Sequence, residues 1–301
     1  MKTRRKIRHQ LTWYSFIIIS VICLLVLTYI PMGTTIKYSF FDARTLGFEG
    51  DFCGWQNYRV LVNNPAFLKS ILNTFVLTAL SLLQIPIGYI FACLINGIRS
   101  RRLQSFFRVG YYMPNIITGV SVVLVFRVVL KENDGLLNRA LSMLLHSNIE
   151  IGWLTDPAVA KFGATILNLW ANIGYCILIC LANLQGISDD IREAAEVDGA
   201  NGLKNWFYIT TPLMKDCFIF LLITNTIAGF SRFTDLFIIG GNTASGRPGG
   251  SLQTLLMYIY QYSFEYPNFG MASAGAMILF VLTFAVTMLN LKFTGFFKKQ
   301  A

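Results

Sequence analysis

The stretch EAAEVDGANGLKNWFYITTPLM, which runs from Glu193 to Met214, decides how this chain is interpreted. It is polar and helix-forming, it is broken by Gly199 and Gly202, and a long apolar segment lies on each side of it. Such a segment is more than a connection in so apolar a chain. We therefore expect a docking element through which a soluble partner acts on a membrane protein.

The rest of the sequence has the composition of a membrane protein. Of its 301 residues, 54% are hydrophobic and only 13% are charged, whereas soluble domains carry about 25% charged residues. A net charge of +10 would suit nucleic-acid binding in a soluble protein, but here the basic residues cluster at the ends of apolar segments. We interpret them as topology signals and expect the lipid bilayer, and no nucleic acid, as a partner.

The apolar segments predict an all-α polytopic membrane protein with six transmembrane helices, each near the roughly 20 residues that span a bilayer. The basic segment 1–12 before the first of them suggests a signal peptide, but no small-residue cleavage site follows, so we interpret that run as a true span. The predicted spans are Trp13–Ile30, Leu72–Ile95, Val109–Val129, Gly163–Leu184, Phe218–Ile239 and Met271–Leu291.

The distribution of basic residues predicts the orientation. An even number of spans places both termini on one side, and short loops rich in Lys and Arg face the cytoplasm. We therefore expect both termini and the loop 186–216 in the cytoplasm of a bacterial or archaeal cell, with residues 13–301 forming one transmembrane domain. The short loop after the second span carries Arg99, Arg101, Arg102 and Arg108.

Local rules predict a helix–turn–helix within this loop. Ser188 or Asp189 can cap a first helix whose early acidic residues suit the helix dipole. The glycines that follow allow a sharp turn. A second short helix through Phe207 is expected to stop near Pro212.

The same residues resemble the conserved loop of ABC importer permeases, most closely the carbohydrate-type, maltose-transporter-like ones. The pattern EAA-x-x-DGA-x(6)-F-x-I-x-x-P-L is nearly complete, and weaker similarity at Trp55–Tyr58, Asp134–Asn138 and Trp153-Leu154 extends the resemblance over nearly the whole chain. It implies a type I importer permease fold and a loop that docks onto an ATP-binding subunit. The residues it assigns to docking are Glu193, Ala194, Ala195, Asp198, Gly199, Ala200, Phe207 and Pro212.

The resemblance also implies an assembly. This chain would be the transmembrane permease subunit that forms half of the translocation path of an ATP-driven carbohydrate importer. Its partners would be a second homologous permease, two copies of an ATP-binding subunit and an extracytoplasmic solute-binding protein. ATP and Mg would bind to the ATP-binding subunit, so no cofactor is expected in this chain.

The residues provide no catalytic or metal-binding pattern, so we predict a transport subunit and not an enzyme. The two histidines are far apart, and the six cysteines mostly lie in apolar runs, without disulfide or zinc-site spacing. The stretch Gly241–Gly246 has the glycine spacing of a phosphate loop, but Arg247 and Pro248 follow where that motif needs Lys and Ser or Thr. We expect a flexible outer loop there that meets another subunit.

Two predicted spans place polar residues along one helix face. Because polar groups in hydrocarbon are costly unless they are paired or face a wet cavity, two interpretations stay open. The residues line a path where amides and a phenol bind sugar hydroxyls, with Gly229 leaving room, or they join neighbouring helices. Aligned on the loop, these positions fall near the sugar contacts of maltose-type permeases. They are Asn168, Asn172 and Tyr175 in the fourth span, and Asn225, Gly229 and Arg232 in the fifth.

The charged residues near the spans leave further alternatives. Arg232 is structural if it pairs with Asp235, and favours an acidic ligand if it is free in a cavity. Arg127 is expected to snorkel to the interface. The scarcity of acids within the spans favours an external energy source. The rival interpretations are an ABC permease for a non-sugar solute such as a glycerol phosphate, and a stand-alone secondary transporter.

Overall fold

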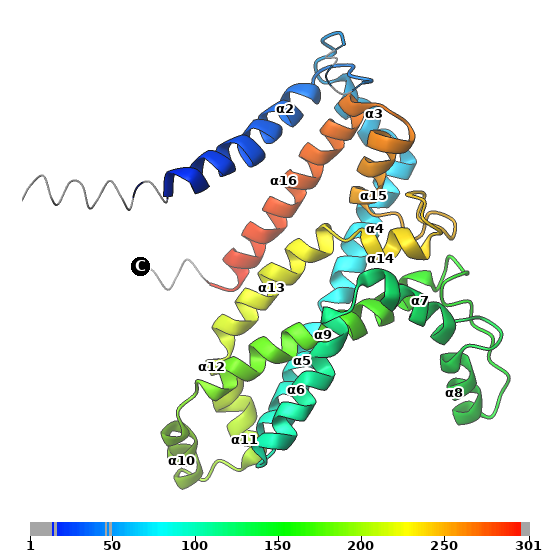
Figure 1. The fold of residues 1–301 in the computed structure, drawn as a ribbon. Coiled ribbons are helices and arrows are strands. Elements are labelled where there is room, and N and C mark those ends of the chain that lie inside the picture. Colours follow the sequence, from blue (N-terminus) through cyan, green and yellow to red (C-terminus); the bar gives the residue numbers. More distant parts are fainter. Residues whose placement is uncertain (1–13, 15–16, 46, 48–49, 296–301) are drawn as a thin grey trace, which may run out of the picture. The chain divides into compact units, whose positions relative to one another are not determined.

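The structure, a computed structural model, describes residues 14, 17–45, 47 and 50–295. The predicted basic segment 1–12 and the predicted start of the first span at Trp13 lie outside these residues. Within them, five helices are long and apolar enough to cross a membrane, and six if one bent helix pair counts as a single span. Figure 1 shows the helices, and an isolated β-bridge joins Phe41 to Phe52.

The chain divides into two compact units, which are described separately. Unit 1 contains residues of Met1–Asn64 and Ile259–Ile278, and unit 2 contains residues of Pro65–Tyr258 and Leu279–Ala301. The long helix α16, Phe269–Phe293, therefore begins in unit 1 and ends in unit 2.

Unit 1 holds the first candidate span, Ile17–Tyr38, which includes the π-helical turn η1 (Leu25–Tyr29) and α2 (Ile30–Tyr38). The predicted end at Ile30 is wrong because the helix continues through Pro31. That proline lies in the first turn of α2, directly after the wider π turn, where its missing N–H is tolerated. The unit also contains α3 (Gln56–Val62) and the π-helical turn η3 (Gln261–Glu265).

Unit 2 is organised around α9, a helix of 26 residues that packs along α5 and α6. Helix α13 packs against α4 in the same unit. Its elements are α4 (Pro65–Ser81), α5 (Gln84–Asn96), α6 (Arg101–Ile116), α7 (Gly119–Val129), α8 (Leu136–Leu145), α9 (Ala160–Gln185), α10 (Asp189–Val197), α11 (Gly202–Asn205), η2 (Trp206–Thr210), α12 (Thr211–Leu213), α13 (Lys215–Phe230), α14 (Thr234–Ile239) and, at its border, α15 (Leu255–Tyr260).

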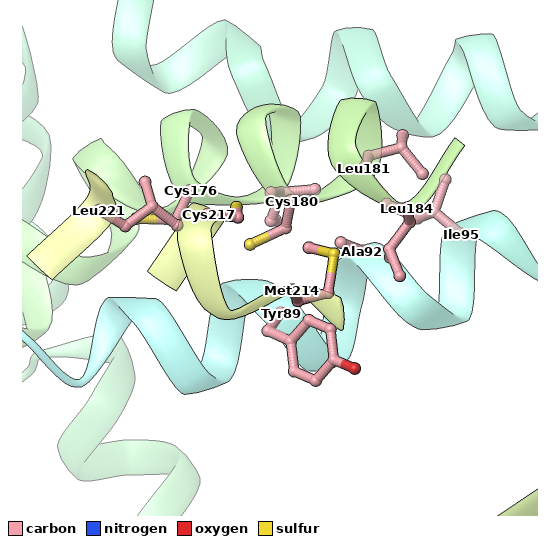
Figure 2. Close-up of a cluster of buried hydrophobic side chains, with 11 residues drawn as sticks. Tyr89, Ala92, Ile95, Cys176, Cys180, Leu181, Leu184, Met214, Cys217 and Leu221 are labelled. Atoms are coloured by element: carbon pink, nitrogen blue, oxygen red, sulfur yellow. The ribbon is translucent and has the colours of Figure 1, made fainter. Parts of the chain in front are cut away.

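Small residues allow the helices of unit 2 to approach closely. A Cβ on Gly174 of α9 would lie 2.2 Å from the carbonyl oxygen of Tyr111 in α6. Figure 2 shows the core where α5, α9 and α13 meet, with three buried cysteines among its aliphatic side chains. Cys176, Cys180 and Cys217 therefore pack as small buried hydrophobes, and all six cysteines are free of disulfides.

The third span is broken, and the prediction of a continuous helix over Val109–Val129 is wrong. Helices α6 and α7 meet at a bend of 100°, with Ile117 and Thr118 in extended conformation between them. Pro114 removes one backbone donor from the last turn of α6. Apolar composition cannot distinguish a straight helix from a bent helix pair, because the same apolar residues are compatible with both.

Arg127, which is expected to snorkel to the interface, is exposed and binds the end of a neighbouring helix. Its guanidinium donates a hydrogen bond from Nη2 to the carbonyl oxygen of Ile238 and a longer one, 3.4 Å, to that of Ile239. These carbonyls end α14, where backbone acceptors lack helical partners and carry partial negative charge. The arginine therefore caps a neighbouring helix.

Buried asparagines hold the loops between the spans. Asn73 of α4 donates from Nδ2 to the carbonyl oxygens of Gly250 (2.9 Å) and Gln253 (3.0 Å), and Ala244 and Leu252 in the same loop are fully buried. The predicted flexible loop is therefore a packed one. In the Asp134–Asn138 motif, the Asn138 amide donates to the carbonyls of Glu132 (2.7 Å) and Ile151 (2.9 Å) and accepts from the indole of Trp153 (2.7 Å).

Candidate functional site

A polar cavity of about 370 Å³ lies within unit 2. All six positions predicted from the two helix faces line it, so the structure brings the fourth and fifth spans together along those faces. Their role as a substrate path stays a prediction. The lining residues are Ser81, Gln84, Asn115, Asn168, Asn172, Tyr175, Thr224, Asn225, Ala228, Gly229 and Arg232, and we call this space the central cavity.

The amide side chains of the wall differ in their hydrogen-bond partners, which belong either to another helix or to the same helix. The Oδ1 atom of Asn225 accepts from Nε2 of Gln84 at 2.5 Å, and its Nδ2 donates to the Leu221 carbonyl at 2.7 Å, so Asn225 joins α13 to α5. Asn172 donates only to the Asn168 carbonyl of its own helix, at 3.0 Å. Asn225 therefore joins helices and also lines the cavity, whereas Asn172 lines the cavity and is bonded within its own helix.

Sequence reasoning missed four polar lining residues: Ser81, Gln84, Asn115 and Thr224. Gln84 is the clearest signal, since it is an amide within the apolar run SLLQIP. Its Oε1 atom is buried and has no hydrogen-bond partner among the described residues. Asn115 lies beside Pro114, just before the bend of the third span, and its place in the wall depends on that bend.

Gly229 lines the cavity, but not for the reason predicted. A Cβ at this position would lie 2.6–2.9 Å from the side-chain atoms of Thr78 in α4. The absent side chain therefore lets α13 pack against α4 and does not leave room for a ligand.

Arg232 pairs with Asp235 across the break between α13 and α14. Its Nε and Nη2 atoms lie 2.9 and 2.6 Å from Oδ2 of Asp235, and Nη2 also donates to the Ala164 carbonyl at 2.6 Å. The two side chains are 5% and 18% exposed. Of the two alternatives for Arg232, the structure has the paired one.

A second polar cavity, of about 340 Å³, adjoins the first. It shares Asn115, Asn168, Asn172 and Arg232 with the central cavity, and we call it the adjoining cavity. Ile117 and Gly119, at the bend of the third span, line it as well. Non-helical backbone at membrane depth is tolerated where it borders a cavity, which gives a physical reason for the bend.

The loop 186–216, called the docking segment below, begins with α10. The Ser188 hydroxyl accepts from the amide of Asp190 at 3.3 Å, in agreement with the predicted cap. After α10 the amide of Ala200 bonds to the Ala195 carbonyl at 2.9 Å, while Gly199 adopts a φ of +84°. This geometry is that of a helix that ends at a glycine in the left-handed conformation. It explains why the motif has a glycine at position 199.

The second half of the docking segment is one helical run of changing pitch. The Asn201 side chain caps α11 by accepting from the amide of Lys204 at 2.9 Å. The π-helical η2 follows, and α12 then carries Pro212 in its first turn. The prediction that the helix stops near Pro212 is confirmed, since α12 ends at Leu213 and the turn at Met214 separates it from α13. As before Pro31, a wider turn precedes the proline and accommodates its missing N–H.

Trp206 attaches this run to α5. Its indole stacks on the ring of Tyr89 with centroids 5.7 Å apart, and its Nε1 donates to Sγ of Cys93 at 3.1 Å. The Tyr89 hydroxyl in turn lies 2.8 Å from Oγ1 of Thr211. The docking segment is thus bonded to a membrane helix at two points.

The docking segment also has an exposed apolar face. Val197 is 87% and Tyr208 79% exposed, and Leu203 and Phe207 are exposed beside them. Of the residues assigned to docking by resemblance, Ala195 is buried, Ala200 is half-buried, and Glu193, Ala194, Asp198, Gly199, Phe207 and Pro212 are exposed. Exposed apolar side chains outside the candidate spans are typical of a protein interface.

Titration and metal chemistry add little to this site. Outside the spans, the hydrogen bond and charge of Arg139 hold the pKa of the Asp134 carboxyl below its ordinary value. No group of three or more His, Cys, Asp or Glu side chains suited to a metal occurs in the part of the chain that the structure describes.

Comparison with known proteins agrees with this geometry. The family described as binding-protein-dependent transport system inner membrane component matches residues 84–294. The multiple sugar-binding transport system permease protein MsmF of Streptococcus mutans is 29% identical over 98% of this chain and 99% of its own length. The arabinooligosaccharides transport system permease protein AraP of Halalkalibacterium halodurans is 30% identical over 93% of this chain and 86% of its own.

A solved structure of similar fold is a chain of a bacterial alginate ABC transporter in complex with an alginate pentasaccharide-bound periplasmic protein. It matches with a TM-score of 0.79 and 21% identity over 95% of this chain and 94% of that one. This likeness confirms the predicted permease fold.

Proposed function

Because this chain belongs to the family of binding-protein-dependent transport system inner membrane components, we propose that it forms half of the translocation path of an ATP-driven importer for a carbohydrate. The family predicted from the loop is thereby confirmed. The chain is a multi-pass membrane protein of a transport system, and the family is one of permease subunits rather than enzymes.

The observation that carries the proposed cargo is the meeting of the two predicted polar faces at the central cavity. Apart from Arg232, the polar groups of its wall are amides, hydroxyls and one phenol, which offer both donors and acceptors to a sugar. The relatives from Streptococcus mutans and Halalkalibacterium halodurans, named for sugar and arabinooligosaccharide transport, support the same class of cargo.

The proposed assembly follows from the exposed docking segment. An ATP-binding subunit contacts the exposed apolar face of the docking segment. One copy of this subunit binds to this chain and a second copy to a second homologous permease. ATP and Mg bind to the ATP-binding subunits. A solute-binding protein delivers the sugar from outside the cell. Both termini and the docking segment lie in the cytoplasm of this arrangement.

The test is uptake by the assembled transporter, isolated through a tag on this chain and reconstituted in lipid vesicles. Sugar uptake is expected to need ATP on the docking side and the solute-binding protein on the other. Uptake without ATP would contradict the importer, and ATP hydrolysis that responds to glycerol phosphate but to no sugar would contradict the cargo.

Asn172→Ala is expected to raise the apparent KM for sugar uptake about tenfold, the loss typical of one ligand hydrogen bond that forms without water competition. Asn172 lines both cavities and is bonded only within α9, so its loss breaks no link between helices. Asn183→Ala is the control, because Asn183 makes the same bond to its own helix, to Ile179 at 3.0 Å, outside both cavities. An unchanged KM in Asn172→Ala would remove this residue from the path.

A further inference from the structure

The charges around the two cavities are few and lie together. The central cavity has Arg232 as its one charged lining residue, and the adjoining cavity has Arg232 and Asp235. All other polar lining groups are uncharged amides, hydroxyls or a phenol. Among the residues that the structure describes, the full charges in the cavity walls are therefore the two that pair with each other.

The pair is strongly held. Two guanidinium nitrogens of Arg232 contact the same oxygen of Asp235, and the Ala164 carbonyl accepts from one of them. With Arg232 only 5% exposed, water screens the pair little. The guanidinium keeps one nitrogen, Nη1, that is buried and has no partner among the described residues.

We propose that this ion pair makes the translocation path selective for uncharged sugars, and that Asp235 is the residue that excludes acidic ones. This inference rests on the proposed carbohydrate cargo. It specifies the charge of that cargo from the pairing of Arg232 and Asp235 in the cavity wall.

The physical reason lies in what a sugar carboxylate would meet. To bind Arg232 it would have to displace Asp235, or lie beside it and suffer like-charge repulsion in a poorly screened site. A neutral sugar has no such cost. Its hydroxyls can donate to and accept from the amides and hydroxyls of the wall.

Removing the charge of Asp235 reverses the preference. Asp235→Asn keeps an oxygen that can accept from Arg232 but leaves the guanidinium charge unbalanced, and guanidinium binds carboxylate well. The double variant Arg232→Gln with Asp235→Asn removes both charges and is expected to restore the neutral preference. That rescue separates the charge of the pair from its role in packing.

The experiment is saturation-transfer NMR on the assembled transporter in lipid nanodiscs, isolated through a tag on this chain, with millimolar trisaccharides and their C6-oxidised counterparts as probes. Galactotriose with trigalacturonate, and cellotriose with its uronate, differ only in the carboxylates. The wild type is expected to show transfer to at least one neutral sugar and about tenfold less to its acidic counterpart. Asp235→Asn is expected to raise the acid-to-neutral ratio about tenfold, and the double variant to return it.

Asp134→Asn is the matched control, because it removes the same charge from the exposed pair of Asp134 and Arg139, 2.9 Å apart, outside both cavities. Its ratio is expected to equal that of the wild type. A wild type that prefers the acidic sugars, or an Asp235→Asn variant with an unchanged ratio, would overturn the inference but leave the carbohydrate cargo standing. No transfer to any sugar in any variant would overturn the cargo and this inference together.

Discussion

Glu193→Lys is expected to reduce ATP-driven uptake by the assembled transporter to background, while the chain still folds and inserts. Glu193 is exposed on α10, beside the exposed apolar face of the docking segment. In the proposed assembly it meets the ATP-binding subunit, where removal of one partner of a buried charge pair costs about 2–5 kcal/mol. Folding is spared because the side chain is exposed in the chain itself.

The measurement is uptake in vesicles together with recovery of the ATP-binding subunit on the tagged chain. Glu150→Lys provides the control, since it makes the same charge reversal at an exposed residue outside the docking segment. Loss of both uptake and recovery in Glu193→Lys alone would support the docking role. Uptake at the wild-type level would show that Glu193 is not needed for the contact with the ATP-binding subunit.

Gly174→Ala is expected to destabilise unit 2 strongly. The added Cβ would lie 2.2 Å from the carbonyl oxygen of Tyr111 and 3.0 Å from the Cα of Tyr112, and backbone atoms cannot rotate away as a side chain can. Helices α6 and α9 must then separate. We expect a loss on the order of 3 kcal/mol, at the upper end of the typical cost of overpacking.

Thermal unfolding of the purified chain in detergent measures this effect. Gly110→Ala is the control, since Gly110 lies in α6, the other helix of this contact, and a Cβ there would have no atom within 4 Å. That variant should keep or slightly raise the unfolding temperature because alanine favours helix. Equal stability of the two variants would show that α6 and α9 are not in the close contact described.

The sequence predicts the lining of the central cavity only in part. Helical spacing alone is sufficient to place Asn168, Asn172 and Tyr175 on one face, because a straight helix has a fixed period. It cannot place Asn115, whose position depends on a bend that apolar composition does not specify. Nor can it tell that Gly229 faces Thr78, since that depends on how α13 and α4 pack against each other.

The docking segment illustrates the same limit at shorter range. Its motif predicts two helical parts and the turn at Gly199, which local rules govern. The π-helical turn before Pro212 forms where backbone amides bond to the carbonyl five residues back instead of four. The stacking of Trp206 on Tyr89 helps to stabilise this turn. A contact so distant in sequence cannot be read from either segment alone.

The burial of the cysteines gives the chain a natural label for its orientation. Cys176, Cys180 and Cys217 lie in the helix core, out of reach of water-soluble reagents (Figure 2). Cys23 lies within an apolar span, and the half-buried Cys93 of α5 accepts a hydrogen bond from the indole of Trp206 in the docking segment. Cys53 is half-exposed in a loop between the first two spans. A membrane-impermeant maleimide added to intact cells should therefore modify Cys53 if that loop is extracellular. This labelling reports the topology of the natural chain without any substitution.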